Sequence, residues 1–288
     1  TEMKLMEILA GIAVTCSTAD GNMEITGISY DSRQVKQGDL FVAITGYAAD
    51  GHRFIPMAVE KGAAAVLCER APEIDIPYVQ VENARLAMAL ASANFFGHPA
   101  DAMTFVGITG TNGKTSSTYL LKTVLEKTLG AKVGLIGTIQ NMIGDQVLET
   151  ERTTPESFEL QKLFYEMKQA GCTHVIMEVS SHSLVLDRVA GIRFQVGIFT
   201  NLTQDHLDFH KTMEEYRKAK AILFRRCAIG VFNGDDEATP KILETATCKP
   251  MTFGEKPEND LQAVAPILHS DGVEFTARYG ERRAHVHL

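Results

Sequence analysis

The stretch Thr104-Phe-Val-Gly-Ile-Thr-Gly-Thr-Asn-Gly-Lys-Thr115 restricts what this chain can fold into more than any other part of it. Its first half, residues 104–109, is β-branched and apolar and predicts a short buried strand. A glycine-rich turn over residues 110–115 follows, and from Ser116 apolar residues recur at helical spacing until Gly130. A strand, a Gly-Lys-Thr turn and a helix in this order indicate a loop that binds the phosphates of a nucleotide.

The residues of this loop predict how it would bind ATP. Backbone N–H groups and the positive end of the helix would face the phosphates, over Gly110, Thr111, Asn112, Gly113, Lys114, Thr115 and Ser116. The Lys114 side chain would reach the outer phosphates, and the Thr115 hydroxyl would bind Mg²⁺. The general pattern requires glycine where Ile108 stands, so an ordinary strand–turn–helix connection is the alternative. The flanking strand and helix occur where a phosphate loop needs them, which favours the loop.

Composition limits the class of protein. With 288 residues, 45% hydrophobic and 22% charged, the chain is typical of a globular protein and long enough for two domains. A net charge of −8 argues against a nucleic-acid partner. There is neither a signal-peptide pattern at Thr1 nor an apolar run near the ~18 residues of a membrane span. The five cysteines have no disulfide or zinc spacing, which predicts a reducing, cytoplasmic setting.

The pattern of strands and helices predicts two α/β domains. In residues 1–98, expected strands at 25–30, 40–44, 64–68 and 78–81 alternate with helices at 56–61 and 86–96. Gly97-His-Pro99 breaks the chain and sets the predicted boundary, so that residues 99–288 form the second domain. Its expected strands, at 104–109, 133–136, 174–179, 196–200 and 229–233, alternate with helical segments. This pattern predicts a mostly parallel, doubly wound sheet with ligands at the carboxyl ends of the strands.

Polar segments follow the expected strands of both domains. In the first domain, Asp31-Ser-Arg33 and the segment 46–52 are either ordinary turns or ligand-binding loops. In the second, Arg152-Thr-Thr-Pro155 predicts a helix start, with Thr154 as N-cap and proline at the first helical position. The tandem threonine and the preceding arginine could instead bind an anion. The residues alone leave both pairs of alternatives open.

A carboxylate ends the apolar strand His174-Val-Ile-Met-Glu178. An ionised buried carboxylate needs a cation, so Glu178 is expected to bind Mg²⁺ or, alternatively, to pair with Arg188. The following residues, 180–182, are expected to form a polar loop. A Ser–His nucleophile pair is disfavoured there because no Gly-x-Ser-x-Gly elbow is present.

Four acidic and imidazole side chains lie close together in the sequence, at Asp205, His206, Asp208 and His210. They favour a hard-cation or phosphate site, with a solvated loop as the alternative. After them, Thr212-Met-Glu-Glu215 predicts a capping box at the start of a helix. Two lysines of that helix, at 218 and 220, are by default surface residues.

Five motifs in register resemble those of the Mur ligases, which use ATP to join amino acids to carboxylates. They are Gly-Thr-Asn-Gly-Lys-Thr, Thr-Thr-Pro, Glu-Val-Ser-Ser-His, Thr-Asn-Leu-Thr-Gln-Asp-His-Leu-Asp and Glu-Tyr-Arg-Lys-Ala-Lys. The sequences of these motifs are most similar to those of the branch of the family that adds the third amino acid to UDP-N-acetylmuramoyl-L-alanyl-D-glutamate in peptidoglycan synthesis. Asp-Ser-Arg and Gly-Asp-Leu-Phe-Val-Ala in the first domain resemble its uridine-nucleotide domain. The resemblance covers nearly the whole chain.

The resemblance implies a mechanism and roles for named residues. ATP would phosphorylate the substrate carboxylate, and an amine would then attack the acyl phosphate. The implied catalytic residues are Lys114, Glu178, His206 and Lys220, of which Lys220 matches the carbamylated lysine of the family. Thr115 and Glu178 would bind one Mg²⁺, Glu178 and His206 a second, with the Lys220 carbamate at the metal site. The implied substrate-binding residues are Ser32, Thr153, Thr154, Ser180 and Arg188. Close relatives can carry Asn in place of Arg152.

The resemblance also sets expectations for the whole protein. A third, C-terminal domain of the family carries the amino-acid pocket, and this chain stops at Leu288, which predicts a fragment that binds substrates but turns over poorly. The expected amino acid is meso-diaminopimelate rather than L-lysine, and the expected protein is a monomer that does not insert into membranes. Two alternatives remain: a non-catalytic nucleotide-binding module, and a folylpolyglutamate-synthetase-like ligase. The second is disfavoured by the hundred or so residues that precede the phosphate loop.

Overall fold

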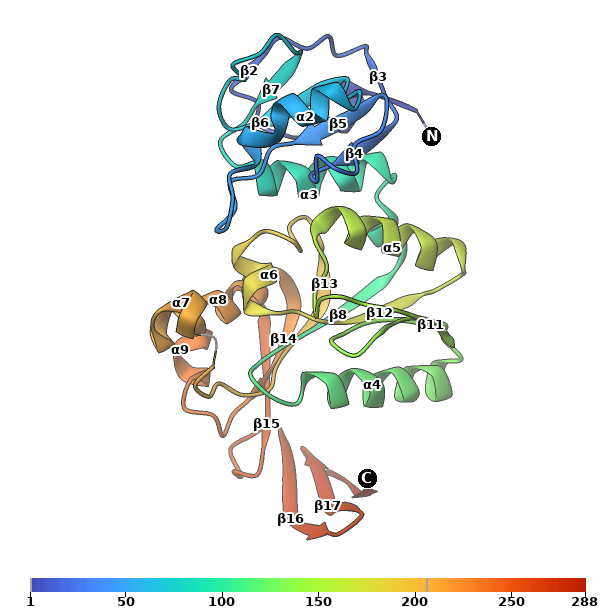
Figure 1. The fold of residues 1–288 in the computed structure, drawn as a ribbon. Coiled ribbons are helices and arrows are strands. Elements are labelled where there is room, and N and C mark those ends of the chain that lie inside the picture. The colour runs from blue at the N-terminus through green and yellow to red at the C-terminus, as the bar shows by residue number, and fades with distance from the viewer. Residues whose placement is uncertain (1, 206) are drawn as a thin grey trace. The chain divides into compact units, whose positions relative to one another are not determined.

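The computed structural model describes residues 2–205 and 207–288, which form two compact units (Figure 1). The first unit comprises Thr1–Ala102 together with two later segments, Pro155–Lys168 and Leu186–Gly191. The second unit comprises Met103–Thr154, Gln169–Val185 and Ile192–Leu288. The units are therefore not continuous in sequence, and each is described by itself.

The first unit is built around a 5-stranded sheet with strand order β2-β7-β6-β5-β4. Strands β4 to β7 are parallel, and β2 joins the edge antiparallel to β7. A separate two-stranded pairing joins β1 and β3. The bounds are β1 Met3–Lys4, α1 Leu5–Ile8, β2 Cys16–Ser17, β3 Glu24–Ile25, β4 Gly27–Ser29, β5 Asp39–Val42, η1 Gly51–Phe54, α2 Ile55–Glu60, β6 Ala65–Cys68, β7 Tyr78–Gln80, α3 Ala84–Phe95, η2 Pro99–Ala102 and α5 Ser157–Gln169.

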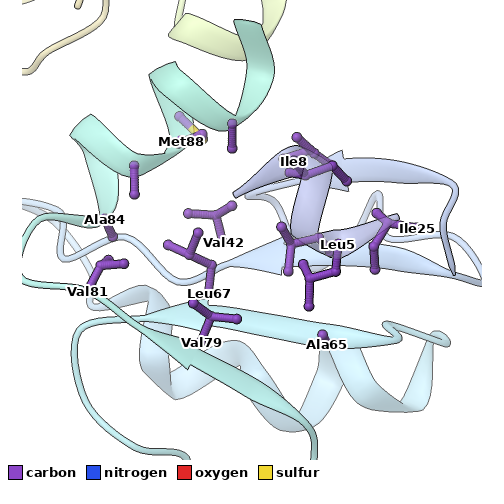
Figure 2. Close-up of a cluster of buried hydrophobic side chains, with 14 residues drawn as sticks. Leu5, Ile8, Ile25, Val42, Ala65, Leu67, Val79, Val81, Ala84 and Met88 are labelled. Carbon is purple, nitrogen blue, oxygen red and sulfur yellow. The ribbon is translucent and has the colours of Figure 1, made fainter. Parts of the chain in front are cut away.

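Both faces of this sheet are covered, because alternate residues of its central strands enter two different hydrophobic clusters. Leu40, Val42 and Leu67 pack in one cluster with Met88 of α3 (Figure 2). The residues between them, Phe41 among them, pack in the other with side chains of α2. Successive side chains of a strand point to opposite faces, so the continuous apolar runs of β5 and β6 follow from helices on both sides. The predicted α/β class of this region is confirmed.

The second unit contains an 11-stranded sheet with strand order β11-β10-β9-β12-β8-β13-β14-β15-β16-β17-β18. Strands β9, β12, β8, β13, β14, β15 and β16 pair in parallel, whereas β10, β11, β17 and β18 are antiparallel additions. The mostly parallel sheet predicted for this region is confirmed. The bounds are β8 Thr104–Thr109, α4 Lys114–Leu129, β9 Val133–Ile136, β10 Asn141–Ile143, β11 Gln146–Leu148, β12 His174–Glu178, α6 Ser181–Val185, β13 Phe194–Phe199, α7 Leu207–His210, α8 Met213–Ala221, η3 Ile222–Arg225, β14 Cys227–Asn233, α9 Thr239–Leu243, β15 Lys249–Gly254, β16 Leu261–His269, β17 Gly272–Tyr279 and β18 Arg282–His287.

Parallel pairing places the polar ends of several strands at one edge. Strand β8 lies between β12 and β13, with Ile108 opposite both Glu178 and Ile198. Helix α4 follows β8 directly and packs on β8, β9 and β12. The carboxyl ends of these strands therefore meet beside the start of α4, where the sequence predicted ligands.

Two local predictions were wrong, for related reasons. Helix α5 begins at Ser157, so Thr154 is not its N-cap; the Thr154 hydroxyl donates instead to the Glu178 carbonyl, at 2.9 Å. The segment expected to be a polar loop contains the short helix α6, and the Ser180 hydroxyl accepts from the Ser183 N–H at its start, at 3.1 Å. In both cases a hydroxyl bonds to the backbone: that of Thr154 to a strand end distant in sequence, and that of Ser180 to the N–H three residues on, at the start of α6. The capping role of Thr212 is confirmed, since its hydroxyl accepts from the Glu215 N–H at 3.1 Å.

The helices of both units are too short or too polar for a bilayer. Across the described residues, none of them combines the length and the apolar character that crossing a membrane requires.

Leu67→Ala tests the packing of the first unit. Leu67 is fully buried, so its truncation is expected to lower the free energy of unfolding by about 2–5 kcal/mol through lost burial and the cavity left behind. Leu86→Ala is the matched control, because Leu86 lies exposed on α3 and Ala suits a helix. Urea unfolding of both variants measures the difference; equal losses would contradict the assigned core.

Candidate active site

The turn after β8 needs glycine at two positions. Gly110 has φ +147°, and a Cβ there would lie 1.8 Å from the Thr200 hydroxyl oxygen. Gly113, with φ +86°, occupies the N-cap position of α4 in the left-handed region. L-residues rarely adopt such backbone angles, so these glycines allow the chain to turn sharply from the strand into the helix. The loop residues Gly110 to Ser116 thus lie at the start of a helix of 16 residues, as a phosphate loop requires.

The segment after β13 holds this loop in place. The Asn201 side chain binds Asn112 twice, accepting from its N–H and donating to its carbonyl, both at 3.0 Å. The Thr200 hydroxyl donates to the same carbonyl, at 2.7 Å. The Thr111 hydroxyl accepts from the Thr203 N–H, at 3.0 Å. The loop conformation is therefore fixed by a polar segment of the neighbouring strand and not by glycine alone.

Lys114 is mostly buried and folds back over the loop. Its Nζ donates to the carbonyls of Gly110, at 2.8 Å, and Thr111, at 3.0 Å. Burial lowers the pKa of Lys114, and the negative charges of Glu178 and Asp205 oppose that shift. The ammonium therefore contacts the backbone of the loop itself, and its contact with the outer phosphates stays a prediction.

Glu178 lies at the end of β12 and is 1% exposed. Its Oε1 accepts from the Thr115 hydroxyl and from the Thr138 N–H, both at 2.9 Å. Its Oε2 accepts from the Thr138 hydroxyl, at 2.9 Å. The structure thus brings together Thr115 and Glu178, the two residues predicted to share a Mg²⁺. The alternative partner, Arg188, forms an ion pair with Glu156 at 3.0 Å.

Sequence reasoning missed Thr138, which contacts both oxygens of Glu178. The available signal was its position directly after Gly137, where strand β9 has ended. A Cβ at Gly137 would approach Glu178 Oε1 to 2.7 Å, so the backbone comes close to the carboxylate there. Thr138 follows a glycine at the carboxyl end of a parallel strand, as Thr111 does after β8, so it could have been named as a candidate site residue on the same grounds.

Thr153, Thr154 and Ser180 lie at the same strand end. The hydroxyl oxygens of Thr153 and Thr138 are 2.9 Å apart. The Thr154 hydroxyl accepts from the Ser180 N–H, at 3.2 Å, while it donates to the carbonyl of Glu178. Three of the predicted substrate-binding residues therefore lie at the end of β12: Thr154 and Ser180 at its backbone, and Thr153 beside Thr138, which donates to the Glu178 carboxylate.

Lys220 is not a surface lysine, which corrects the default expectation. It is 2% exposed, and its Nζ donates to the Gly110 carbonyl at 3.0 Å, the carbonyl that Lys114 also contacts. Burial and the neighbouring charge of Lys114 lower the pKa of Lys220 to about 7, against the opposing effect of Asp205. Lys218 is on the surface as expected, paired with Glu214 at 2.8 Å.

Tyr216 is a second residue that sequence reasoning missed. It is buried, its ring centroid lies 4.4 Å from Lys220 Nζ, and its hydroxyl lies 3.3 Å from the Thr111 hydroxyl. It stands one helical turn before Lys220 in α8. That spacing places both side chains on one face of the helix and was the signal available in the sequence.

The predicted acidic and histidine cluster is only partly described. His206 lies outside the described residues. His210 is buried in α7, with its Nε2 2.8 Å from the Ser181 hydroxyl oxygen. Within residues 2–205 and 207–288, no three His, Cys, Asp or Glu side chains are grouped so as to hold a metal ion. A metal site that includes His206 therefore stays a prediction.

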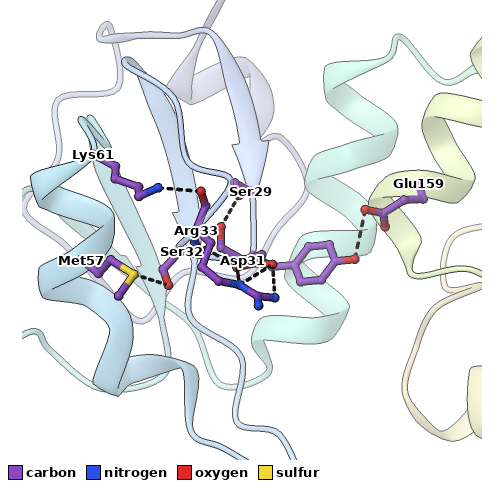
Figure 3. A network of polar contacts seen from close by, with 8 residues as sticks. Ser29, Asp31, Ser32, Arg33, Met57, Lys61 and Glu159 are labelled. Atoms are coloured by element: carbon purple, nitrogen blue, oxygen red, sulfur yellow. Dashed lines mark hydrogen bonds and ion pairs between the residues drawn. The ribbon is translucent and has the colours of Figure 1, made fainter.

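Hydrogen bonds and ion pairs hold both loops of the first unit, and Figure 3 shows those of the loop that contains Asp31, Ser32 and Arg33. Ser32 is buried and its hydroxyl donates to the Met57 sulfur at 3.3 Å, while Arg33 pairs with Asp31 at 2.7 Å. The guanidinium beside it lowers the pKa of Asp31. In the other loop, the ring of His52 contacts Asp50 at 2.8 Å through Nδ1 and accepts from the Glu69 N–H at 3.0 Å through Nε2. These contacts fit ordinary loop stabilisation.

The strand–loop–helix geometry is shared with known proteins. The model of the Mur ligase middle domain matches residues 108–288, and that of the Mur ligase family catalytic domain matches residues 24–99. The chain belongs to the Mur ligase family. Structures under 25% identical show the same fold: a MurF ligase of Thermotoga maritima in complex with ADP, with a TM-score of 0.59 and 20% identity over 90% of this chain and 57% of that one, and a Mycobacterium tuberculosis folylpolyglutamate synthase, with 0.55 and 15% identity over 67% of this chain and 51% of that one.

Two curated relatives and one solved structure carry the same activity in their names. Proteins of Clostridium tetani and Clostridium acetobutylicum named as UDP-N-acetylmuramoyl-L-alanyl-D-glutamate–2,6-diaminopimelate ligases are 46% and 49% identical, over 99% of this chain. A solved structure with that name superposes with a TM-score of 0.84 at 26% identity, over 99% of this chain and 59% of that one. The chain spans about 60% of the length of the curated relatives it matches.

Gly110→Ala is expected to disrupt the phosphate loop. The new methyl group would collide with Thr200, adding about 1–3 kcal/mol of overpacking to the backbone strain. Gly130→Ala is the control, because its φ of +61° carries strain but no atom lies within 4 Å of a Cβ. Thermal unfolding and binding of ADP measure the outcome: ADP binding is expected to fail in the first variant only, and its survival there would contradict the close approach of Gly110 to Thr200.

Lys220→Met tests the pKa of Lys220. Its pKa is about 7, below the ordinary 10.5, so between these values the unfolded chain holds a proton that the folded chain lacks. The free energy of unfolding should therefore rise with pH over this range in the parent chain, by about 1.4 kcal/mol for each unit by which the pKa is lowered. Lys220→Met should lose that rise, whereas Lys218→Met should keep it. Urea unfolding from pH 7 to 10 in CO₂-free buffer is the measurement, and parallel curves for the parent and Lys220→Met would refute the shift.

Proposed function

We propose that this chain provides the substrate- and ATP-binding part of a ligase that adds the third amino acid to UDP-N-acetylmuramoyl-L-alanyl-D-glutamate. The amino acid is meso-diaminopimelate in preference to L-lysine, because the relatives that match over 99% of the chain carry diaminopimelate in their names. The first unit binds the UDP-muramoyl dipeptide, and the second binds ATP. The enzyme acts in the cytoplasm in peptidoglycan synthesis, as a monomer.

The reaction has two covalent steps. The glutamate carboxylate attacks the γ-phosphorus of ATP, the bond to the β-phosphate oxygen breaks, and ADP leaves. The amine of the incoming amino acid then attacks the acyl carbon, the bond to the phosphate oxygen breaks, and phosphate leaves while the amine loses a proton. The physical obstacle in the first step is the approach of a carboxylate to a triphosphate, since both are anions.

The observation that carries the proposal is that two lysines, one mostly buried and one fully buried, donate to the same carbonyl of the phosphate loop. Lys114 and Lys220 both donate to the Gly110 carbonyl, at 2.8 and 3.0 Å. Burial lowers the pKa of Lys220 most, and the positive charge of Lys114 lowers it further. A polyanion at the loop would favour the charged forms of both lysines and relieve the repulsion between them. The arrangement therefore favours a nucleotide triphosphate as the ligand.

The residues present fit Mg²⁺. The Thr115 hydroxyl and the Glu178 carboxylate, 2.9 Å apart beside the loop, are the oxygen ligands that a hard cation prefers. Bound there, Mg²⁺ would neutralise charge on the transferred phosphoryl group. The Thr138 hydroxyl orients the carboxylate by donating to its second oxygen.

Carbamylation of Lys220 is part of the proposal. The neutral amine, not the ammonium, adds to CO₂, and a pKa of about 7 keeps much of Lys220 neutral at physiological pH. The N–C bond forms, one proton leaves the nitrogen, and the side chain changes from a cation to an anion. That change would turn a lysine beside the phosphate loop into an oxygen ligand for a cation, together with Glu178 and His206.

Calorimetry with the chain itself tests the proposed function. We expect it to bind ATP with Mg²⁺ and, separately, UDP-N-acetylmuramoyl-L-alanyl-D-glutamate. Lys114→Met should weaken ATP binding by about 10–100-fold, since it removes a charge-assisted contact, and leave the binding of the muramoyl dipeptide unchanged. Lys127→Met, an exposed lysine of the same helix, is the control.

Two other outcomes would separate the rival functions. Binding of ATP without the muramoyl dipeptide would replace the ligase proposal by a nucleotide-binding module. Binding of a folate in place of the muramoyl dipeptide would favour a folylpolyglutamate-synthetase-like ligase.

A further inference from the structure

A buried carboxylate of the first unit is shared by two arginines. Glu156 Oε1 pairs with Arg188 at 3.0 Å, and its Oε2 pairs with Arg85 at 3.3 Å. The side chains are 8%, 13% and 20% exposed, in the order Glu156, Arg188 and Arg85. Each carboxylate oxygen therefore serves a different guanidinium, in a setting where an ion without partners would be costly.

The three residues come from parts of the sequence that are far apart. Arg85 lies in the first turn of α3, Glu156 directly precedes α5, and Arg188 lies in the segment 186–191. All belong to the first unit. The cluster thus joins the two late segments of that unit to its N-terminal region.

A second link joins the Arg188 segment to the same turn of α3. The Asn83 side chain caps α3 by accepting from the Leu86 N–H at 3.1 Å, and its amide donates to the Asp187 carboxylate at 3.1 Å. Asp187 has φ +54°, and its carbonyl accepts from the Ala190 N–H at 3.2 Å. Arg188 therefore follows a residue that is itself anchored, on a tight turn.

The three side chains of the cluster carry one negative and two positive charges. Glu156 alone would cancel the charge of Arg188 and weaken the binding of any anion to Arg188. Arg85 restores a net positive charge to the group, so that the cluster holds one guanidinium by a salt bridge without becoming neutral. Fixing a binding group in place before the ligand arrives reduces the entropy that binding costs.

We propose that Glu156 and Arg85 are positioning residues for Arg188, and that they set its orientation toward an anionic group of the UDP-muramoyl dipeptide. The inference rests on the proposed function, because it takes the ligand of Arg188 from there. The first turn of α3 then has a role in substrate recognition: through Asn83 and Arg85 it determines where Arg188 lies.

Glu156→Gln separates positioning from charge, because the two predict changes of opposite sign. If Glu156 positions Arg188, the dissociation constant of the muramoyl dipeptide rises by roughly tenfold, the loss of one charged hydrogen bond. If Glu156 merely competes with the ligand for Arg188, the substitution removes the competitor and binding becomes tighter. Tighter or unchanged binding overturns the proposal.

Arg85 provides a second series that does not disturb the carboxylate. Arg85→Met is expected to weaken binding of the muramoyl dipeptide, and Arg85→Lys to recover much of the loss because it keeps the ion pair. Arg53→Met, an exposed arginine of the same unit, is the matched control. If Arg85→Met binds as tightly as the parent chain, the role of α3 is refuted.

Calorimetry with UDP-N-acetylmuramoyl-L-alanyl-D-glutamate and, separately, with ATP and Mg²⁺ gives both readouts. ATP affinity should stay unchanged in every variant, which a general loss of structure would not allow, and circular dichroism checks that each variant folds. Failure of the parent chain to bind the muramoyl dipeptide would refute the proposed function. Binding by the parent, with no weakening in Glu156→Gln or Arg85→Met, would refute the positioning role alone.

Discussion

The structure of the second unit depends on a carboxylate that is kept out of water at the end of a strand. Glu178 is retained in a 1% exposed position because Thr115 and Thr138 hydrogen-bond to its two oxygens. Each donor comes from a different parallel neighbour of β12: Thr115 follows β8, and Thr138 follows β9. Strand order therefore decides which residues satisfy the carboxylate, and the same order places it beside the phosphate loop.

Two lysine side chains meet at one backbone group of the phosphate loop. A single carbonyl, that of Gly110, accepts from Lys114 of α4 and Lys220 of α8. Because Gly110 has no side chain, Thr200 and Asn201 can approach it closely on another side. Burial lowers the pKa of Lys220, and the neighbouring charge of Lys114 lowers it further. Two basic side chains gathered at one loop favour an anionic ligand there.

The first unit shows how far apart in sequence the members of one buried ion-pair cluster can be. Arg188 follows β12 in the chain, yet its ion-pair partner Glu156 also contacts Arg85 from the N-terminal region. The boundary predicted between residues 98 and 99 divides the chain into two continuous segments. The compact units instead assign Pro155–Lys168 and Leu186–Gly191 to the first unit, and the split of functions between the units stays a proposal.

The local sequence pattern was sufficient to predict an element wherever the contacts that determine it are close in sequence. Strand β8 and strand β9 have the predicted bounds, and the turn between Thr109 and Lys114 forms as its glycines required. The cap at Thr212 also follows from neighbouring residues. For these elements, side-chain periodicity and backbone freedom act over a few residues, so the sequence contains the whole cause.

Other features depended on partners that only the folded chain brings near. The hydrogen-bond partners of Thr154 could not be predicted, because its hydroxyl could bond either to its own helix or to the backbone at the end of β12, where it is found. Lys220 was expected to be exposed, since no local pattern shows that α8 lies against the phosphate loop. By itself, the sequence determined the parallel sheet, the phosphate loop and the family; the tertiary structure decided which hydroxyl reaches which carboxylate and which lysine is buried. The reason is physical: burial and long-range hydrogen bonds are properties of packed elements, and no single segment contains them.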